Sequence, residues 1–131
     1  MRQSLLIESK MRDNHQTYSQ RQLKAGENLK KILARIFIQQ NILLPEIDTK
    51  LITVTEVRIS PDFKHAKIFF LPLAGKEILK FSDVLNQNSL EIKKIASKEW
   101  TAKFMPNLKF VKDESFDYAE KIENLLLKGK N

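Results

Sequence analysis

Residues 51–71, LITVTEVRISPDFKHAKIFFL, constrain the fold of this 131-residue chain more than any other segment. The first half of the segment is rich in β-branched residues, and the second half contains two adjacent phenylalanines. Side chains of these types fit the half-buried surface of a β-sheet. Between the halves, Pro61 presets φ for a tight turn, and Asp62 can accept hydrogen bonds from the backbone N–H groups that follow it. The segment therefore predicts a β-hairpin.

An amphipathic helix is predicted before the hairpin, over residues 19–39. Its apolar residues share one arc of the helical wheel, and Lys24, Lys31 and Arg35 lie on the opposite arc with Glu27. Gly26 is a weak helix former inside this stretch, so we expect the helix to pack closely against the sheet there. The apolar faces of all elements together predict a shared core that contains Ile32, Leu33, Ile36, Val57, Ile59, Ile68, Phe70, Ile95 and Phe110.

A second helical region is predicted over residues 76–104, with a polar interruption at residues 86–89. Asn and Ser compete with helical hydrogen bonds, so a kink or break is expected at the interruption. A strand over residues 107–112 and a short helix over residues 115–127 complete the chain. The order α-β-β-α-kink-α-β-α predicts an α+β fold, with helices on one face of a three-stranded sheet. This is the order of a type II KH domain, although the GXXG loop by which KH domains clamp single strands is absent.

Length and composition limit the functions that this chain can have. The length fits one KH-like domain over residues 19–127, with a flexible arm over 1–18 and a tail over 128–131. The chain has no cysteine, which excludes disulfides, iron–sulfur clusters and thiolate zinc sites. No apolar run approaches the ~20 residues that a membrane span requires, and the N-terminus lacks a secretory pattern, so we expect a cytoplasmic protein. Translation could start at Met1 or at Met11.

The charge balance points to an anionic partner. The chain has 23 Lys and Arg residues against 16 Asp and Glu residues, for a net charge of +7. A basic surface of this kind favours nucleic acid over lipid, because no basic segment forms a strongly apolar-faced surface helix. The alternative is a solvated basic surface without a specific partner.

Four stretches resemble the ribosome-binding factor A family, a bacterial family with type II KH topology. They are SQRQLKAGENLKKIL, TVTEVRISPDFKHAKIFFLPL, MPNLKFVKDES and AEKIENLL, and they span about residues 19–127. In this family an Ala-x-Gly kink replaces the GXXG loop. The corresponding residues here are Asn88, Ser89 and Leu90, which keep neither the alanine nor the glycine. We expect Leu90 to close the space that a small residue would leave for backbone or RNA.

The resemblance implies a function that the residues alone do not establish. Members of the family bind the free 30S small ribosomal subunit, act late in its assembly, and support maturation of 16S rRNA near its 5′ end, by binding rather than catalysis. It implies no cofactor and no small-molecule substrate, and we expect a monomer. The alternatives are a general single-stranded RNA-binding KH-type module, and a structural adaptor that binds protein. The missing GXXG loop favours the assembly factor over the general module.

The predicted RNA-binding surface follows the kink. Lys93, Lys94 and Lys98 occupy the polar side of the helix after it, with Lys103 near the predicted helix end. The family tends to be basic at Lys93, Lys98 and Lys103, which favours phosphate contact over an ordinary solvated face. The residues Lys24, Lys31 and Arg35 of the first helix form the predicted secondary patch.

Other residues with reactive or aromatic side chains are assigned structural roles. His15 and His65 lack metal-ligand spacing and a catalytic partner, and Asp62 is expected to form the turn rather than an acid–base pair with His65. Trp100 could stack on a nucleobase, but it lies beside the apolar arc, which favours a position at the core boundary. Phe63, in the turn, is the expected surface aromatic residue.

Overall fold

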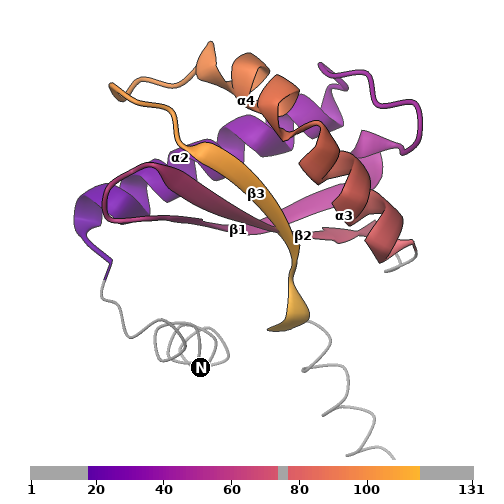
Figure 1. Cartoon of the computed structure of the whole chain (residues 1–131), viewed down its shortest axis with the longest axis horizontal. Coiled ribbons are helices and arrows are strands. Elements are labelled where there is room, and N and C mark those ends of the chain that lie inside the picture. Colours follow the sequence, from indigo (N-terminus) through magenta and orange to yellow (C-terminus); the bar gives the residue numbers. More distant parts are fainter. Residues whose placement is uncertain (1–17, 74–76, 116–131) are drawn as a thin grey trace, which may run out of the picture. The chain divides into compact units, whose positions relative to one another are not determined.

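The computed structural model describes residues 18–73 and 77–115, of which residues 19–112 form one compact unit (Figure 1). The predicted arm (residues 1–18, apart from Tyr18), C-terminal helix (residues 115–127, apart from Ser115) and tail (residues 128–131) lie outside the described residues. The elements in chain order are α2 (Gln20–Ile38), the 3-10 helix η1 (Thr49–Leu51), β1 (Ile52–Ile59), β2 (His65–Pro72), α3 (Ile78–Gln87), α4 (Ser89–Ser97) and β3 (Asn107–Lys112).

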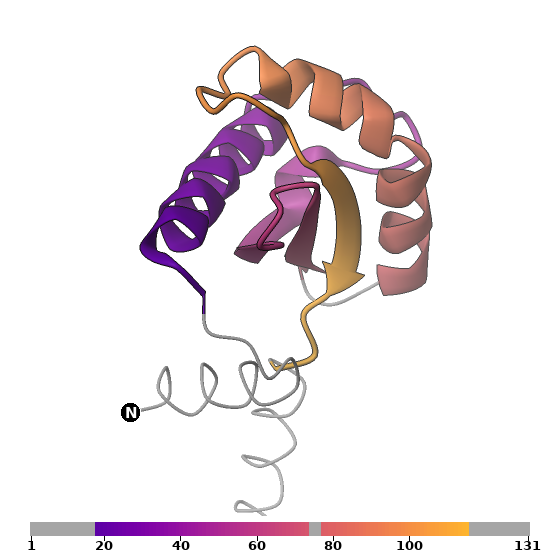
Figure 2. The ribbon, with the colours of Figure 1, turned by 60° about the vertical axis from the view of Figure 1, so that its left-hand side comes forward.

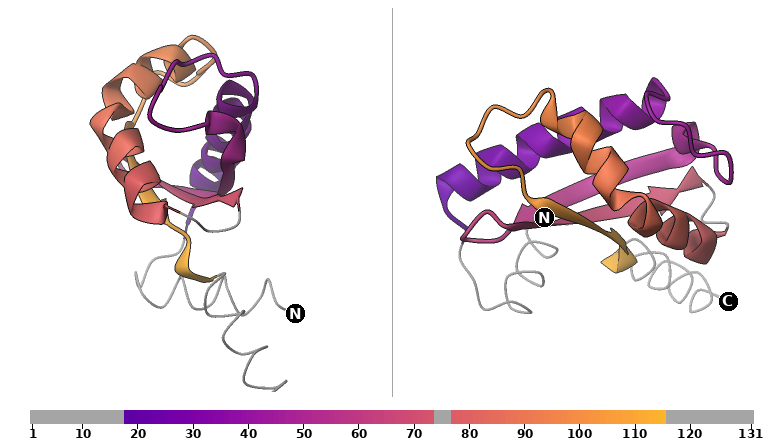
Figure 3. Two further views of the ribbon diagram at one scale, coloured as in Figure 1. Left: turned by 90° about the vertical axis from the view of Figure 1, so that its right-hand side faces the viewer. Right: turned by 45° about the horizontal axis from the view of Figure 1, so that its top comes forward.

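The three strands form a mixed sheet in the order β1-β2-β3. β1 and β2 are the predicted antiparallel hairpin, and β1 contains a bulge between Val54 and Glu56. β3 is parallel to β2, and α3 and α4 supply the long crossover that parallel neighbours require. The helices lie on one face of the sheet (Figures 2 and 3). The predicted α+β, KH-like arrangement is therefore confirmed for the described elements.

The core lies between the helices and the covered face of the sheet. Burial alternates along the strands, as expected when one face of a sheet is packed and the other is open. Seven of the nine predicted core residues are buried, whereas Val57 and Ile95 are only partly buried and pack against the core. The buried seven are Ile32, Leu33, Ile36, Ile59, Ile68, Phe70 and Phe110.

Helix α2 is fixed to the sheet near its N-terminus. Ser19 caps the helix: its hydroxyl accepts a hydrogen bond from the Gln22 backbone N–H at 3.1 Å, and the Gln22 side chain accepts one from the Ser19 N–H at 2.9 Å. The buried Gln22 amide also donates to the Ile59 carbonyl at 2.8 Å. At Gly26, a Cβ atom would lie 2.7 Å from the Val57 carbonyl oxygen. The expected close packing at Gly26 is confirmed.

The hairpin turn is held by the side chains that its sequence predicted. The Lys64 N–H donates to the Asp62 carboxylate at 3.0 Å, and the Ser60 hydroxyl donates to the same oxygen at 2.6 Å. These hydrogen bonds, the one from Ser60 first, hold the pKa of Asp62 below its usual value of 3.8. Phe63 has a left-handed backbone conformation, with φ of 60°, and its N–H donates to the Ser60 carbonyl. Asp62 therefore forms the turn, as expected.

The second helical region ends earlier than predicted. Helix α4 stops at Ser97, and residues 98–106 form a loop that leads to β3. The N–H groups of residues 98–100 donate to carbonyls three residues earlier, which tightens the chain out of the α-helix. The indole N–H of Trp100 then donates to the Phe104 carbonyl at 2.9 Å across the loop. Ala102, which lies within the predicted helical region 76–104, is in this loop and exposed.

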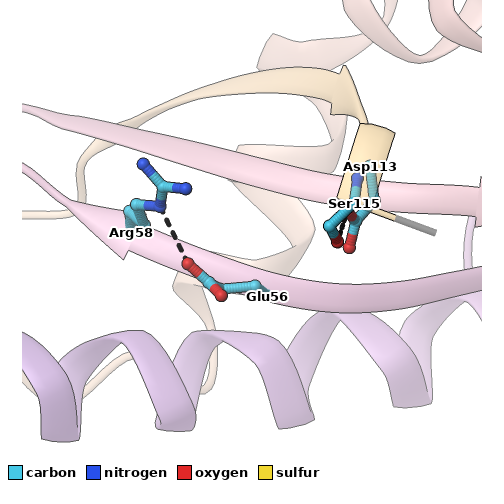
Figure 4. Close-up of polar contacts among 4 residues, drawn as sticks. All are labelled: Glu56, Arg58, Asp113 and Ser115. Carbon is cyan, nitrogen blue, oxygen red and sulfur yellow. Dashed lines mark hydrogen bonds and ion pairs between the residues drawn. The ribbon is translucent and has the colours of Figure 1, made fainter. Parts of the chain in front are cut away.

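Asp113 and Ser115, just after β3, form a contact of the kind that caps a helix. The side chain of Asp113 accepts a hydrogen bond from the Ser115 N–H at 3.0 Å (Figure 4). An acidic side chain that accepts from an N–H two residues later is typical of a helix N-cap. This agrees with the expected start of a helix near residue 115.

Candidate nucleic-acid interface

Helices α3 and α4 are separated at Asn88, inside the predicted interruption. The residue has φ of −108° and ψ of 17°, outside the α-helical region. Its side-chain amide donates to the Val84 carbonyl at 2.8 Å, and its own carbonyl accepts from the Ile92 N–H at 3.0 Å. Asn88 thus satisfies a carbonyl at the end of α3 and accepts the first hydrogen bond of α4.

Leu90 projects to solvent at the helical interruption. Ser89 is half-buried as the first residue of α4, but the Leu90 side chain is 75% exposed. Leu90 lies on the solvent side of α4, because the residues that face the core are Ile92 and Ala96. The expectation that this side chain limits the close approach of RNA at the interruption stays a prediction.

Asn86 connects the end of α3 to the edge of the sheet. Its side-chain amide donates to the Phe110 carbonyl at 2.9 Å, and its side-chain carbonyl accepts from the Phe110 N–H at 2.8 Å. In the described sheet β3 is an edge strand, so these two backbone groups have no neighbouring strand to pair with. Sequence reasoning missed this role, because the pattern identified Asn86 only as part of a helix-breaking run.

The lysines of α4 differ in what they contact. The Lys93 ammonium donates to the Asn107 side chain at 2.8 Å, and Lys93 is half-buried. Lys94 and Lys98 are exposed, and within the described residues they form no ion pair. Lys98 is the C-cap residue of α4 and keeps helical backbone angles, so it lies on the same side as Lys94, four residues earlier. Lys94 and Lys98 are the cations at this end of α4 that are free to bind an external anion.

Lys103 lies in the loop after α4 rather than on a helix, which corrects the prediction. It is exposed, and its ammonium lies 5.3 Å from the centre of the Phe104 ring. The Phe104 side chain is itself 68% exposed. The helical pattern gave no sign of this exposed ring, because the exposure follows from the early end of α4.

The secondary patch on α2 is exposed as predicted, but its members differ in whether they have an ion-pair partner. Lys24 and Lys31 point to solvent, whereas Arg35 forms an ion pair with Glu99, just after α4. The pair places the end of α2 beside the end of α4. Arg35 has part of its charge neutralised by a carboxylate, so it is a weaker candidate for phosphate contact than the two lysines.

The aromatic candidates are both partly buried. Trp100 packs against the core, as expected for a boundary residue. Phe63 was expected to be a surface aromatic residue, but it also packs against the core, and the Arg21 guanidinium lies 4.6 Å from its ring centre. The left-handed turn at Phe63 directs its ring back onto the domain, so this prediction is wrong.

The described residues give no sign of a metal centre. No group of three or more His, Asp or Glu side chains within them could hold a metal ion. His65 is exposed at the start of β2, with its N–H bonded to the Ser60 hydroxyl, and His15 lies outside the described residues. Across the same described part of the chain, no helix is long and apolar enough to cross a membrane.

The sequence profile of the family described as "Ribosome-binding factor A" matches residues 21–126. The chain belongs to the ribosome-binding factor A family. It is 45% identical to the ribosome-binding factor A of Pelagibacter ubique over 108 residues, which is 82% of this chain and 88% of the relative. It is 42% identical to the Dinoroseobacter shibae protein over the same length, which is 82% of this chain and 80% of that relative.

Solved structures of the family share the fold. The crystal structure from Thermus thermophilus matches with a TM-score of 0.59 and 19% identity, over 72% of this chain and 97% of that one. The solution structure from Thermotoga maritima, described as a putative ribosome binding factor A, has a TM-score of 0.60 and 19% identity, over 72% of this chain and 89% of that one. A homology model of the Thermus thermophilus protein, fitted into a cryo-EM map of a 30S complex, matches with a TM-score of 0.55 and 20% identity. The match covers 68% of this chain and 91% of that one.

Proposed function

We propose that this protein is a cytoplasmic, monomeric assembly factor that binds the free 30S subunit through 16S rRNA. We further propose that it supports 5′-end maturation of this RNA late in assembly, by binding rather than by catalysis. Membership of the ribosome-binding factor A family supports the proposal, and the related Thermus protein was fitted into a map of a 30S complex. The observation that carries it to particular residues is the pair of exposed lysines Lys94, on α4, and Lys98, at the C-cap of α4, which form no ion pair within the described residues.

The proposed interface is electrostatic. Lys94 of α4 and Lys98 at its C-cap present two ammonium groups on one side, and Lys103 adds a third from the following loop. Each phosphate that a lysine neutralises releases counterions from RNA, which gives a favourable, salt-dependent contribution to binding. Lys93 contributes by fixing the start of β3 through Asn107, and Lys24, Lys31 and Arg35 form the secondary patch on α2.

Binding alone can promote maturation. A protein that binds one conformation of the RNA more tightly than the others shifts the population toward that conformation by its differential affinity. If the favoured conformation exposes the 5′ end to a nuclease, cleavage becomes faster without any reactive group on the protein. A general single-stranded RNA-binding module remains the alternative, but the clamp loop that such modules use is missing from this sequence.

Charge reversal on α4 tests the interface. The variant Lys94→Glu/Lys98→Glu should lose association with free 30S subunits in gradient sedimentation, and the 5′ ends of 16S rRNA should remain immature in cells that carry it. Lys93 is left intact because it has an internal contact. The matched control is Lys50→Glu/Lys80→Glu, which changes the charge equally at exposed positions on other elements. Equal binding by both variants would contradict the proposed interface.

A further inference from the structure

A row of three basic residues crosses the sheet on the face opposite the described helices α2, α3 and α4. Arg58 of β1 is directly opposite Lys67 of β2, and Lys67 is directly opposite Lys109 of β3. The neighbours of Lys67 and Lys109 along their strands are buried on the core side: Ala66, Ile68, Leu108 and Phe110. Because side chains alternate along a strand, the basic row points away from the core.

The row is electrostatically unfavourable in the isolated unit. Like charges directly opposite each other on a sheet are destabilising. Arg58 is partly compensated, because it donates to Glu56 at 2.8 Å (Figure 4) and its guanidinium lies 4.6 Å from the Phe69 ring centre. Lys67 and Lys109 are exposed, and among the described residues of 19–112 neither forms an ion pair. Among the described residues, two adjacent ammonium groups therefore have no counter-charge, one on the central strand β2 and one on the edge strand β3.

We infer that Lys67 and Lys109 bind phosphate groups of the RNA backbone, with Arg58 at the end of the row. This inference rests on the proposed function and adds a second RNA contact to it. Neighbouring strands are about 4.8 Å apart, so the row is about 10 Å wide, and flexible lysine side chains can reach successive phosphates across that width. Phosphate binding explains why the repulsion is retained, since a local conflict of this kind is expected at functional sites.

The position of the row determines what kind of RNA contact it can make. Helix α4 packs over the covered face of the sheet, whereas the row lies on the opposite face. The two surfaces meet at the edge strand β3, because the Lys93 ammonium of α4 donates to the side chain of Asn107, which lies on the same side of β3 as Lys109. An RNA that folds around this edge would contact both surfaces, whereas a short extended strand on one face would contact only one of them.

The test is the variant Lys67→Gln/Lys109→Gln, with Lys50→Gln/Lys80→Gln as the charge-matched control. Affinity for free 30S subunits and for protein-free 16S rRNA is measured between 50 and 200 mM salt. Loss of two phosphate contacts should lower the salt slope by about 2, and the affinity ratio across this range should shrink by about 10-fold. The melting temperature should stay equal to that of the wild type or rise, because the like-charge repulsion is removed.

Three results would overturn the inference. Slope and affinity equal to those of the control would show that the row does not contact RNA. A lower melting temperature with an unchanged salt slope would show that acidic side chains of the protein itself neutralise the lysines. Residues 113–125 contain five such side chains: Asp113, Glu114, Asp117, Glu120 and Glu123. Weaker binding to subunits with unchanged binding to protein-free rRNA would assign the row to a ribosomal protein.

The inference and the proposed function fail in different ways. If the wild-type protein does not bind free 30S subunits, the proposed function is wrong, and the row has no RNA contact to explain. If the wild type binds, Lys94→Glu/Lys98→Glu abolishes binding and the row variant behaves like its control, only the inference is wrong. If both variants weaken binding, the two surfaces act together, and the salt slope of the wild type should exceed that of either variant.

Discussion

Replacing Asn86 with Ala tests the connection between the helical interruption and the sheet edge. The substitution removes both hydrogen bonds with the Phe110 backbone, at 2.8 and 2.9 Å, and leaves a partly buried N–H and C=O without partners. Each such hydrogen bond contributes about 1 kcal/mol net, and leaving its partner unsatisfied raises the cost. Alanine favours the helix by about 0.5 kcal/mol over asparagine, which offsets part of the loss. We expect the free energy of unfolding to fall by about 2 kcal/mol.

Urea and thermal unfolding, followed by circular dichroism, measure this change. A loss of about 2 kcal/mol in a unit of fewer than 100 residues lowers the melting temperature by roughly 8–16 °C. Gln87→Ala is the matched control, since Gln87 is exposed in the same helical turn and no sheet contact is lost there. Asn86→Asp keeps an acceptor for the Phe110 N–H but loses the donor, so its stability should also fall. If Asn86→Ala were as stable as Gln87→Ala, the contact with Phe110 would contribute nothing.

Three further predictions concern stability. Gly26→Ala should lower the free energy of unfolding by about 1–3 kcal/mol in urea titrations, because the new Cβ would lie 2.7 Å from the Val57 carbonyl oxygen; a neutral or stabilising effect would contradict the close packing. Ile68→Ala should cost about 2–5 kcal/mol by the same measurement, since Ile68 is fully buried at the sheet centre. The pKa of Asp62, measured by NMR titration, should lie below 3.8, so its contribution to stability is complete above that unfolded-state value and is lost as the pH falls through the lower folded-state value. In Asp62→Asn this pH dependence should disappear.

The parts of the fold that local sequence determines were predictable. The hairpin follows from β-branched and aromatic residues around a Ser-Pro-Asp turn, and the structure places Ser60 and Asp62 in the expected turn contacts. The first helix follows from its apolar period and begins at the Ser19 cap. The close packing at Gly26 was also predictable, because a poor helix former inside a strong helix indicates that a larger side chain would not fit there.

The features that sequence reasoning missed depend on contacts between distant residues. Asn86 bonds to Phe110, 24 positions away, and nothing in the sequence around residue 86 distinguishes an edge-strand partner from a helix breaker. The end of α4 was misplaced because the apolar pattern continues to Ala102, whereas the Trp100 indole bond to Phe104 favours a loop. The orientation of Leu90 likewise follows from how α4 packs on the sheet.

Among the described basic residues, some have partners within the domain, and others do not. Lys93, Arg35 and Arg58 are engaged by Asn107, Glu99 and Glu56, so they fix loops and strands in place. A different set is exposed and forms no ion pair within the described residues: Lys94, Lys98, Lys67 and Lys109. An external phosphate competes poorly for a cation that already has a carboxylate partner, but it gains the full attraction of a free one. The engaged residues therefore set the geometry, and the free residues on the two faces would carry the RNA contacts.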